Sequence, residues 1–344
     1  MSLIRKLLFY PFATLLYFIT SIRNFFFDVG IFKEYTFDYF SIGIGNISVG
    51  GTGKSVLVGY LSEILCDRYV INILSRGYRR KSSGFQLANK TSTASHLGDE
   101  PYMFYKQNHK IRVGVCNSRR EGMIKMIESI NKNLKNIFIL DDVYQHRWVR
   151  PSIMILLTEY SKPYFRDYLF PSGNLRESRK SASRADIIII TKCPKNLSIE
   201  EKKEFVSELN IELKQKVFFT KIKYNDYIFG KSKKLPINIL KKIPFILVTG
   251  IADNSLLINE LRTKGLIFKT FNYKDHFKYT KNDVNKIVSL SDGNLILTTE
   301  KDYYKLQEFM NSDLLYFVKI NIHFSEEDSK LFNSYILKKE NQFN

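Results

Sequence analysis

The sequence predicts an α/β fold in which a parallel sheet with helices on both faces is accompanied by a smaller second α/β lobe and an N-terminal membrane-associated helix. Apolar, β-rich runs with helical patterns between several of them are typical of a parallel sheet covered on both sides. The first set of runs covers residues 70–74, 111–116, 137–140, 153–157, 187–190 and 217–222. A second set covers residues 245–249, 266–271, 295–298 and 315–320.

These patterns divide the chain into five predicted parts. The helix occupies residues 1–28, the first sheet and its helices 29–224, and the second lobe 245–330. Between the lobes, residues 225–244 are polar and lysine-rich, which indicates a linker or a hairpin. The lysine-rich end of the chain, residues 331–344, is expected to be a frayed tail.

A glycine-dense turn, IGIGNISVGGTGKS at residues 42–55, links the first strand to a helix expected over 56–65. Glycines allow the backbone to fold tightly and to direct several N–H groups at one anion, and the helix N-terminus adds its positive end. Lys54 can reach the β- and γ-phosphates of a nucleotide, and the Ser55 hydroxyl can bind Mg²⁺. The pattern predicts a P-loop NTPase-like domain, although Ser48 replaces the usual first glycine. The predicted nucleotide-binding residues are Ser48, Val49, Gly50, Gly51, Thr52, Gly53, Lys54 and Ser55.

Composition limits the possible partners. The length of 344 residues is enough for roughly two domains, and the apolar fraction of 44% is enough for a buried core. The net charge is +19. Such a charge suits nucleic acid, an anionic membrane or a phosphorylated substrate. The three cysteines, Cys66, Cys116 and Cys193, show neither metal-site spacing nor a disulfide framework.

The N-terminal apolar run covers residues 7–20 and follows Arg5 and Lys6. Its fourteen residues are short for a membrane span, which needs about 20, and no small-residue cleavage site follows it. We expect a retained helix that is either tilted across the membrane or lies in its interface. A helix packed on the domain surface is the alternative. The remainder of the chain must meet ATP and is therefore expected on the cytoplasmic side.

Two pairs of carboxylates follow predicted secondary structure. Asp141 and Asp142 end the strand 137–140, where an acid opposite the P-loop serine can hold Mg²⁺ directly or through water. Asp99 and Glu100 precede Pro101 at the start of a helical stretch, so either could be a simple helix cap. The functional interpretation places one of them near the γ-phosphate.

Other candidates lie at the ends of predicted strands. His276 lies beside an acid that can fix its tautomer, although a lone loop histidine is more often structural. Arginines at such ends can brace phosphate charge, although surface ion pairs are the alternative. The candidates for contact with phosphate or substrate are Arg76, Tyr78, Glu100, Arg119, Gln145, Arg176 and Glu177.

Taken together, the motifs resemble the tetraacyldisaccharide 4'-kinase (lipid A 4'-kinase) family over nearly the whole chain. The segments that carry the resemblance are, in order, GNISVGGTGKS, SRGY, GDEP, DDVYQH, PSGNLRES, TK at 191–192, VTGIAD, DHF and TTEKD. The family carries Ser or Thr at the position of Ser48. Three residues depart from the family pattern. Ser55 replaces the more usual Thr, Val56 replaces the usual Pro, and Asp253 stands where Pro is common.

The resemblance implies a two-lobed kinase that transfers the γ-phosphate of ATP to the 4'-hydroxyl of tetraacyldisaccharide 1-phosphate, with Mg²⁺, to form lipid IV-A in lipid A biosynthesis. It implies that Lys54 and Ser55 grip the phosphates and metal and that Asp141 and Asp142 hold Mg²⁺. Asp99 would be the catalytic base, with His276 as its partner. We expect a monomer at the cytoplasmic face of the bacterial inner membrane, anchored by the N-terminal helix, with no nucleic-acid partner.

Three alternatives differ in their class of function. A P-loop GTPase or metallochaperone-like switch would need a guanine-reading segment, which residues 191–194 resemble only faintly. A nucleic-acid-stimulated ATPase would need aromatic and basic side chains arranged along a groove. A membrane-anchored nucleotide-binding scaffold would make Asp99 and His276 incidental. Comparing ATP with GTP binding separates the first alternative from the kinase.

Overall fold

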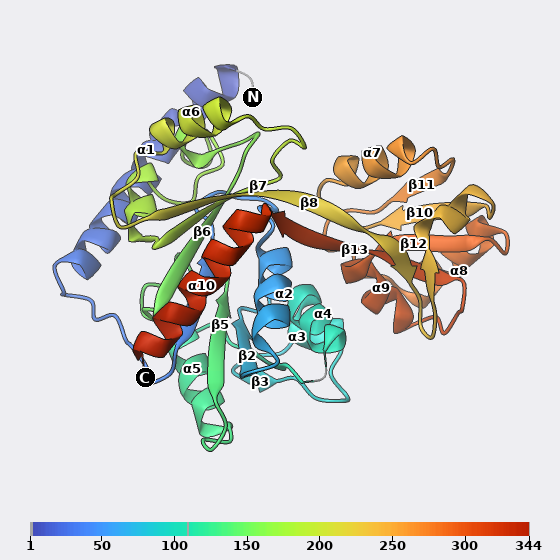
Figure 1. Cartoon of the computed structure of the whole chain (residues 1–344), viewed down its shortest axis with the longest axis horizontal. Coiled ribbons are helices and arrows are strands. Elements are labelled where there is room, and N and C mark those ends of the chain that lie inside the picture. Colours follow the sequence, from blue (N-terminus) through green and yellow to red (C-terminus); the bar gives the residue numbers. More distant parts are fainter. Residues whose placement is uncertain (1–2, 109, 344) are drawn as a thin grey trace.

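The computed structural model describes residues 3–108 and 110–343 and shows two lobes joined by the long strands β8 and β13 (Figure 1). The strands are β1 (Ser41–Gly45), β2 (Val70–Ser75), β3 (Gln86–Leu87), β4 (Arg112–Val115), β5 (Asn136–Asp141), β6 (Ile153–Glu159), β7 (Ile187–Thr191), β8 (Lys216–Phe229), β9 (Lys234–Pro236), β10 (Phe245–Thr249), β11 (Lys269–Asn272), β12 (Leu295–Thr299) and β13 (Leu315–Phe324). The α-helices are α1 (Leu3–Asp28), α2 (Lys54–Leu65), α3 (Ala94–Leu97), α4 (Asp99–Gln107), α5 (Arg119–Glu128), α6 (Ile199–Leu209), α7 (Ser255–Thr263), α8 (Lys281–Ser291), α9 (Glu300–Gln307) and α10 (Glu326–Phe343). Three short 3-10 helices are η1 (Tyr164–Arg166), η2 (Arg179–Arg184) and η3 (Ile237–Lys241).

The predicted parallel sheet is confirmed. Within the described residues the strands form one sheet in the order β11-β10-β12-β13-β8-β7-β6-β1-β5-β2-β4-β3, with β9 paired to β8. In the larger lobe β4, β2, β5, β1, β6, β7 and the start of β8 are parallel neighbours. In the smaller lobe β11, β10, β12 and β13 are parallel, and the antiparallel pair β8 and β13 joins the two parts.

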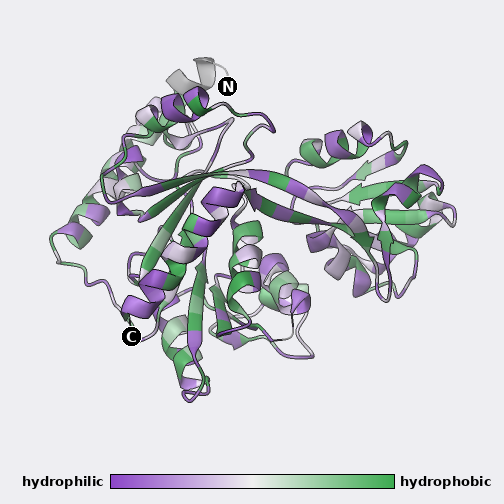
Figure 2. Ribbon diagram, in the orientation of Figure 1, coloured by the Kyte–Doolittle hydropathy of each residue, from purple (hydrophilic) through white to green (hydrophobic). Residues whose placement is uncertain are grey.

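The strands next to the P-loop are buried on both faces. Every residue of β1 and β5 is buried, and Ile42 and Ile44 have no exposed surface. Such strands read as continuous apolar runs, because helices cover both sides of a parallel sheet. Figure 2 shows this as largely hydrophobic central strands in each lobe, while the helices carry both kinds of residue. The sheet is therefore a rigid support for the loops at its strand ends.

The stretch expected to link the lobes is mostly regular structure. Residues 225–229 continue β8, and β9 and η3 follow them. β8 begins beside β7 in the larger lobe and ends beside β13 in the smaller one. The predicted hairpin is present, since β9 pairs antiparallel with the end of β8, and the strands β8 and β13 join the lobes in place of a loose linker.

The expectation of a frayed C-terminal tail is wrong over the described residues. Residues 326–343 form α10, which returns to the larger lobe and buries Phe332 and Ile336 completely. Both join the same core as Ile42 and Ile44. The sequence emphasises the exposed lysines of this helix, but burial of two large apolar side chains outweighs them.

The predicted N-terminal helix is α1, and it presents an apolar surface to solvent. Phe12, Leu15 and Phe18 are each more than half exposed, whereas Ala13 and Thr20 are buried. Among residues 3–108 and 110–343, none of the helices is both long enough and apolar enough to cross a bilayer. The interfacial placement of α1 stays a prediction.

Candidate active site

A cleft of about 1380 Å³ lies where the P-loop, the ends of β2 and β5, and loops of the smaller lobe meet. Loops at the carboxyl ends of parallel strands are where α/β folds bind ligands. Most of the residues predicted from the sequence line it. These are Ser48, Val49, Gly50, Gly51, Thr52, Gly53, Lys54, Ser55, Arg76, Tyr78, Asp99, Glu100, Asp141, Asp142, Gln145, Arg176 and His276.

The P-loop leads directly into α2. Gly53 precedes the helix with φ +91°, and Gly50 has φ +119°, both in the region that side chains rarely adopt. No side chain caps α2, so its first N–H groups remain available to an anion. Thr191 Oγ1 donates to the Thr52 carbonyl at 2.9 Å, which fixes the loop from β7. This arrangement suits a phosphate group.

Lys54 lies at the centre of a charged chain across the cleft floor. Its Nζ is 3.2 Å from Asn46 Oδ1 and 3.3 Å from Asp142 Oδ1. Arg176 Nη1 lies 3.4 Å from the other oxygen of Asp142. Although burial opposes it, these cations hold the pKa of Asp142 below its usual range. Asp142 is therefore ionised and holds two cations that phosphate can also bind.

Asp141 is a carboxylate of the site whose ionised form is disfavoured by its surroundings. It is buried, Ser75 Oγ donates to its Oδ2 at 2.9 Å, and its Oδ1 has no hydrogen-bond partner. Burial, reinforced by the nearby charges of Glu100 and Asp142, raises the pKa of Asp141 to about 7. An orphaned carboxylate oxygen in a negative environment fits a divalent cation.

The donor set around this position also fits Mg²⁺. Ser55 lies at the start of α2, and its Oγ donates to Glu100 Oε1 at 2.9 Å. Within the described part of the chain no group of three His, Cys, Asp or Glu side chains could hold a metal by itself. Mg²⁺ in nucleotide sites usually takes only one or two carboxylates and fills its shell with phosphate and water oxygens. A hydroxyl and one or two acids are therefore sufficient.

Asp99 and His276 meet across the boundary between the lobes. Nδ1 of His276 lies 3.0 Å from Oδ2 of Asp99, and His276 has φ +56°. Lys305 Nζ lies 3.3 Å from the same oxygen. Although burial opposes it, the bond to His276 and the charges of Lys305 and Lys301 hold the pKa of Asp99 below its usual range. The side chain of Asp99 therefore belongs to a cluster of charged groups. It is not a helix cap, because α4 has no side-chain cap.

The loop after β2 contacts the same cluster. The rings of Tyr78 and His276 meet edge to face with centroids 5.4 Å apart. Arg79 Nη1 lies 3.4 Å from the carbonyl of Asp275. Arg76 lines the cleft with an exposed side chain. On the floor, Gln145 donates to the Asn46 carbonyl at 2.9 Å and lies 3.4 Å from Arg176 Nη1.

Arg119 is a correction to the sequence-based candidates. It does not line the cleft, and it is only 1% exposed. It donates to the carbonyls of Cys116 and Asp141 at 2.7 and 3.1 Å, and burial lowers its pKa to about 10. Arg119 braces the strand end that carries Asp141 instead of contacting a ligand.

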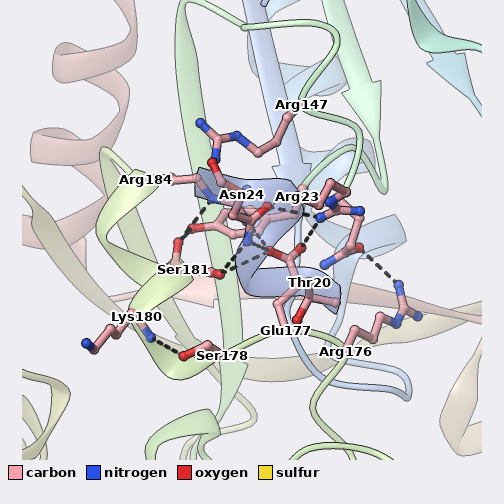
Figure 3. Close-up of polar contacts among 12 residues, drawn as sticks. Thr20, Arg23, Asn24, Arg147, Arg176, Glu177, Ser178, Lys180, Ser181 and Arg184 are labelled. Carbon is pink, nitrogen blue, oxygen red and sulfur yellow. Dashed lines mark hydrogen bonds and ion pairs between the residues drawn. The ribbon is translucent and has the colours of Figure 1, made fainter. Parts of the chain in front are cut away.

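Glu177 is the second correction. It is 1% exposed and lies outside the cleft lining. Figure 3 shows it between α1 and the segment after Arg176, where Asn24 and Arg184 donate to its Oε2 at 3.1 and 2.7 Å. Ser181 donates to the same oxygen at 3.0 Å. Glu177 ties α1 to the segment that positions Arg176.

Sequence reasoning missed two buried residues that contact site side chains from outside the cleft lining. Asn46 contacts Lys54, and its only sequence signal is its place inside the P-loop. Lys305 contacts Asp99 although 206 positions separate them, and its only signal is its position one helical turn after Asp302.

The chain is similar to proteins of known function along nearly its whole length. A family model described as Tetraacyldisaccharide-1-P 4'-kinase matches residues 5–340. A tetraacyldisaccharide 4'-kinase of Flavobacterium psychrophilum is 43% identical over 333 residues, which cover 96% of this chain and 95% of that protein. One from Cytophaga hutchinsonii is 35% identical over 96% of this chain and 94% of its own length. The crystal structure of the "apo" form of LpxK from Aquifex aeolicus in complex with ATP matches with a TM-score of 0.78 and 27% identity, covering 97% of this chain and 99% of that one.

Proposed function

The chain belongs to the tetraacyldisaccharide-1-P 4'-kinase family, whose members act in lipid A biosynthesis, and we propose that its cleft performs the transfer with Asp99 as the general base. The observation that carries this proposal is the Asp99 carboxylate, which lines the same cleft as the P-loop and contacts His276 of the opposite lobe. The reaction moves the γ-phosphate of ATP to the 4'-hydroxyl of tetraacyldisaccharide 1-phosphate.

The P-loop and the N-terminus of α2 bind the triphosphate. Residues 48–55 supply backbone N–H groups, and Lys54 exchanges its contacts with Asn46 and Asp142 for phosphate oxygens. ATP is the expected nucleotide, since the similar Aquifex protein was crystallised with it. Arg76, Tyr78, Glu100, Gln145 and Arg176 line the remaining walls and are expected to contact the phosphates or the acceptor.

Ser55, Asp141 and Asp142 would hold Mg²⁺, which when bound supplies positive charge opposite the phosphate oxygens. Asp141 supports this assignment, because its buried oxygen has no hydrogen-bond partner and a bound cation would favour its ionised form. Lys54 and Arg176 supply the remaining positive charge from the protein.

Asp99 accepts the proton of the acceptor hydroxyl. As the hydroxyl oxygen forms its bond to the γ-phosphorus, the bond from that phosphorus to the β,γ-bridging oxygen breaks, and ADP leaves. A sugar hydroxyl is a poor nucleophile, and a carboxylate with a lowered pKa is ionised and ready at neutral pH. His276 orients the carboxylate from the second lobe, so the pair is complete only when the lobes meet.

We further infer that α1 lies in the membrane interface on the cytoplasmic face of the inner membrane. Its exposed Phe12, Leu15 and Phe18 form an apolar surface, and the net charge of +19 favours an anionic leaflet. The acylated acceptor lies in the same membrane. In the division that we propose, the larger lobe includes α10 as well as residues 29–224, because Phe332 and Ile336 join its core. A monomer is the proposed working unit.

The test is transfer from γ-labelled ATP to purified tetraacyldisaccharide 1-phosphate in detergent. Asp99→Ala should lose about 10²-fold or more of the wild-type rate, the scale expected for loss of a general base, while ATP affinity is retained. Ser95→Ala, a nearby change outside the cleft lining, is the matched control. Wild-type protein that hydrolyses ATP or GTP without labelling the lipid would support the switch-type NTPase instead.

A further inference from the structure

Lys305 is a buried cation that no part of the transfer described above has used. It lies on α9 of the smaller lobe and is 5% exposed. Its Nζ lies 2.9 Å from Asp302 Oδ1, 3.3 Å from Asp99 Oδ2, and 3.2 Å from the carbonyl of Phe277. It therefore contacts the proposed base and the residue that follows His276 at the same time.

Lys305 is held firmly from its own lobe. Asp302 is fully buried and accepts hydrogen bonds from the Gly250 N–H and from Thr299 Oγ1, each at 2.8 Å. The ammonium also lies 5.3 Å from the centroid of the Tyr279 ring. A buried cation with this many fixed partners has little freedom to move.

We propose that Lys305 is a positioning residue, which fixes the Asp99 carboxylate against His276 so that one oxygen faces the acceptor hydroxyl. This inference rests on the proposed role of Asp99. His276 Nδ1 and Lys305 Nζ both contact Oδ2 of Asp99, so Oδ1 is the oxygen left to receive the proton. Without Lys305 the carboxylate can turn about its last bond, and small losses of alignment are costly to a transfer reaction.

The charge of Lys305 should also set the pH at which the base works. The ionisable groups around Asp99 come from α4, from the loop that holds His276, and from α9. They are Glu100, Asp275, His276, Tyr279, Lys301, Asp302, Lys305 and Glu308. Burial raises the pKa of Asp99, and the bond to His276 together with Lys305 and Lys301 outweighs burial. Removing the ammonium should therefore move protonation of Asp99 to higher pH.

The experiment compares pH–rate profiles of full-length wild type, Lys305→Met and Lys305→Arg in detergent. Lys305→Met should lose about 10- to 100-fold in kcat with the KM for ATP within about twofold. The acidic limb of its kcat/KM profile should shift upward by about one pH unit, because one favourable charge is lost. Lys305→Arg should return the limb toward its wild-type position.

A second variant excludes a purely structural explanation. Lys305→Met leaves Asp302 buried without its cation, and this alone can destabilise the lobe. The double variant Lys305→Met with Asp302→Asn removes that unpaired charge. It replaces the single variant in the experiment if the single variant fails to fold. It should keep the low kcat and the shifted limb. Recovery of wild-type kcat by the double variant, or an unshifted acidic limb in it, would overturn the proposal.

Two controls separate this inference from its premises. Glu308→Ala removes another contact across the lobes, the 2.8 Å bond from the Ala94 N–H, without removing a cation near Asp99. This variant should not move the acidic limb of the kcat/KM profile to higher pH. A shift as large as that of Lys305→Met would overturn the role given to Lys305. Asp99→Asn with an unchanged rate would instead refute the proposed base itself, whatever Lys305 does.

Discussion

His276 places its Nδ1 3.0 Å from Oδ2 of Asp99, although 177 positions of the chain separate the two residues. Asp99 begins α4 of the larger lobe, and His276 lies in a loop of the smaller one. The pair therefore depends on how the lobes are arranged, and each lobe alone holds half of it.

This arrangement predicts a turnover defect for His276→Ala. Loss of the imidazole should lower kcat by about 10²-fold, because Asp99 loses the partner that orients it, while the KM for ATP stays close to the wild-type value. Steady-state transfer of label to the lipid measures both quantities. A variant with normal kcat and raised KM would show that His276 serves binding only.

Ser55 gives a matched pair of variants. Ser55→Ala removes the hydroxyl expected to bind Mg²⁺, and the Mg²⁺ concentration for half-maximal rate should rise by about tenfold or more. Ser55→Thr keeps the hydroxyl and should stay within about twofold of wild type. Titrating Mg²⁺ at saturating ATP checks both, and equal Mg²⁺ curves for Ala and Thr would contradict the assignment.

His146 predicts that stability falls under mildly acid conditions. Burial, with Arg119 and Arg76 nearby, lowers the pKa of His146 to about 4. At pH values between about 4 and 6.5, His146 is protonated in the unfolded state but neutral in the folded state. The free energy of unfolding therefore falls as the pH drops through this range. From pH 7 to 5 the loss should be roughly 1–2 kcal/mol larger in wild type than in His146→Gln. Urea titrations at the two pH values measure the difference, and parallel losses would refute it.

The C-terminal helix provides a test of the core. Phe332→Ala should reduce the free energy of unfolding by about 3–5 kcal/mol, because the ring is fully buried and stacks on Phe324 at 4.9 Å between centroids. Its neighbour Leu331 is 54% exposed, and Leu331→Ala should change stability by less than about 1 kcal/mol. Denaturant unfolding compares the two, and a similar small loss for both would mean that α10 is not part of the core.

The proposed membrane contact of α1 is tested with vesicles. Leu15→Glu with Phe18→Glu places two charges on its exposed apolar surface and should abolish flotation with vesicles of anionic phospholipid. Leu331→Glu, a charge added at an equally exposed site on α10, should float as wild type does. If the double variant still floats, the contact with the membrane lies elsewhere.

Local patterns were sufficient for the parts of the site that are continuous in sequence. The P-loop and Asp141 each combine an apolar strand with chemistry at its end, so periodicity and residue type locate them together. The pairing of Asp99 with His276 came instead from the resemblance to a family. No local pattern brings together residues from two lobes.

Burial explains the remaining differences. Glu177 resembles a cleft residue in sequence because it stands beside Arg176, which lines the cleft, and Arg119 because it follows a predicted strand. The structure turns both inward, Arg119 onto the carbonyl of Asp141 and Glu177 toward α1. Lys305 was missed for the converse reason, since a lysine in a helix is ordinarily a solvated surface residue. Only tertiary packing makes it a buried cation.

The return of α10 to the larger lobe has a consequence for how the chain folds during synthesis. Phe332 and Ile336 fill the core that contains Ile42 and Ile44, yet they are synthesised after every strand of the sheet in the described residues. Domains usually fold from the N-terminus as they emerge. Here the strands around the P-loop emerge first and lack part of their core until α10 follows. A stop codon shortly before position 326 should therefore release a truncated chain that stays bound to chaperones.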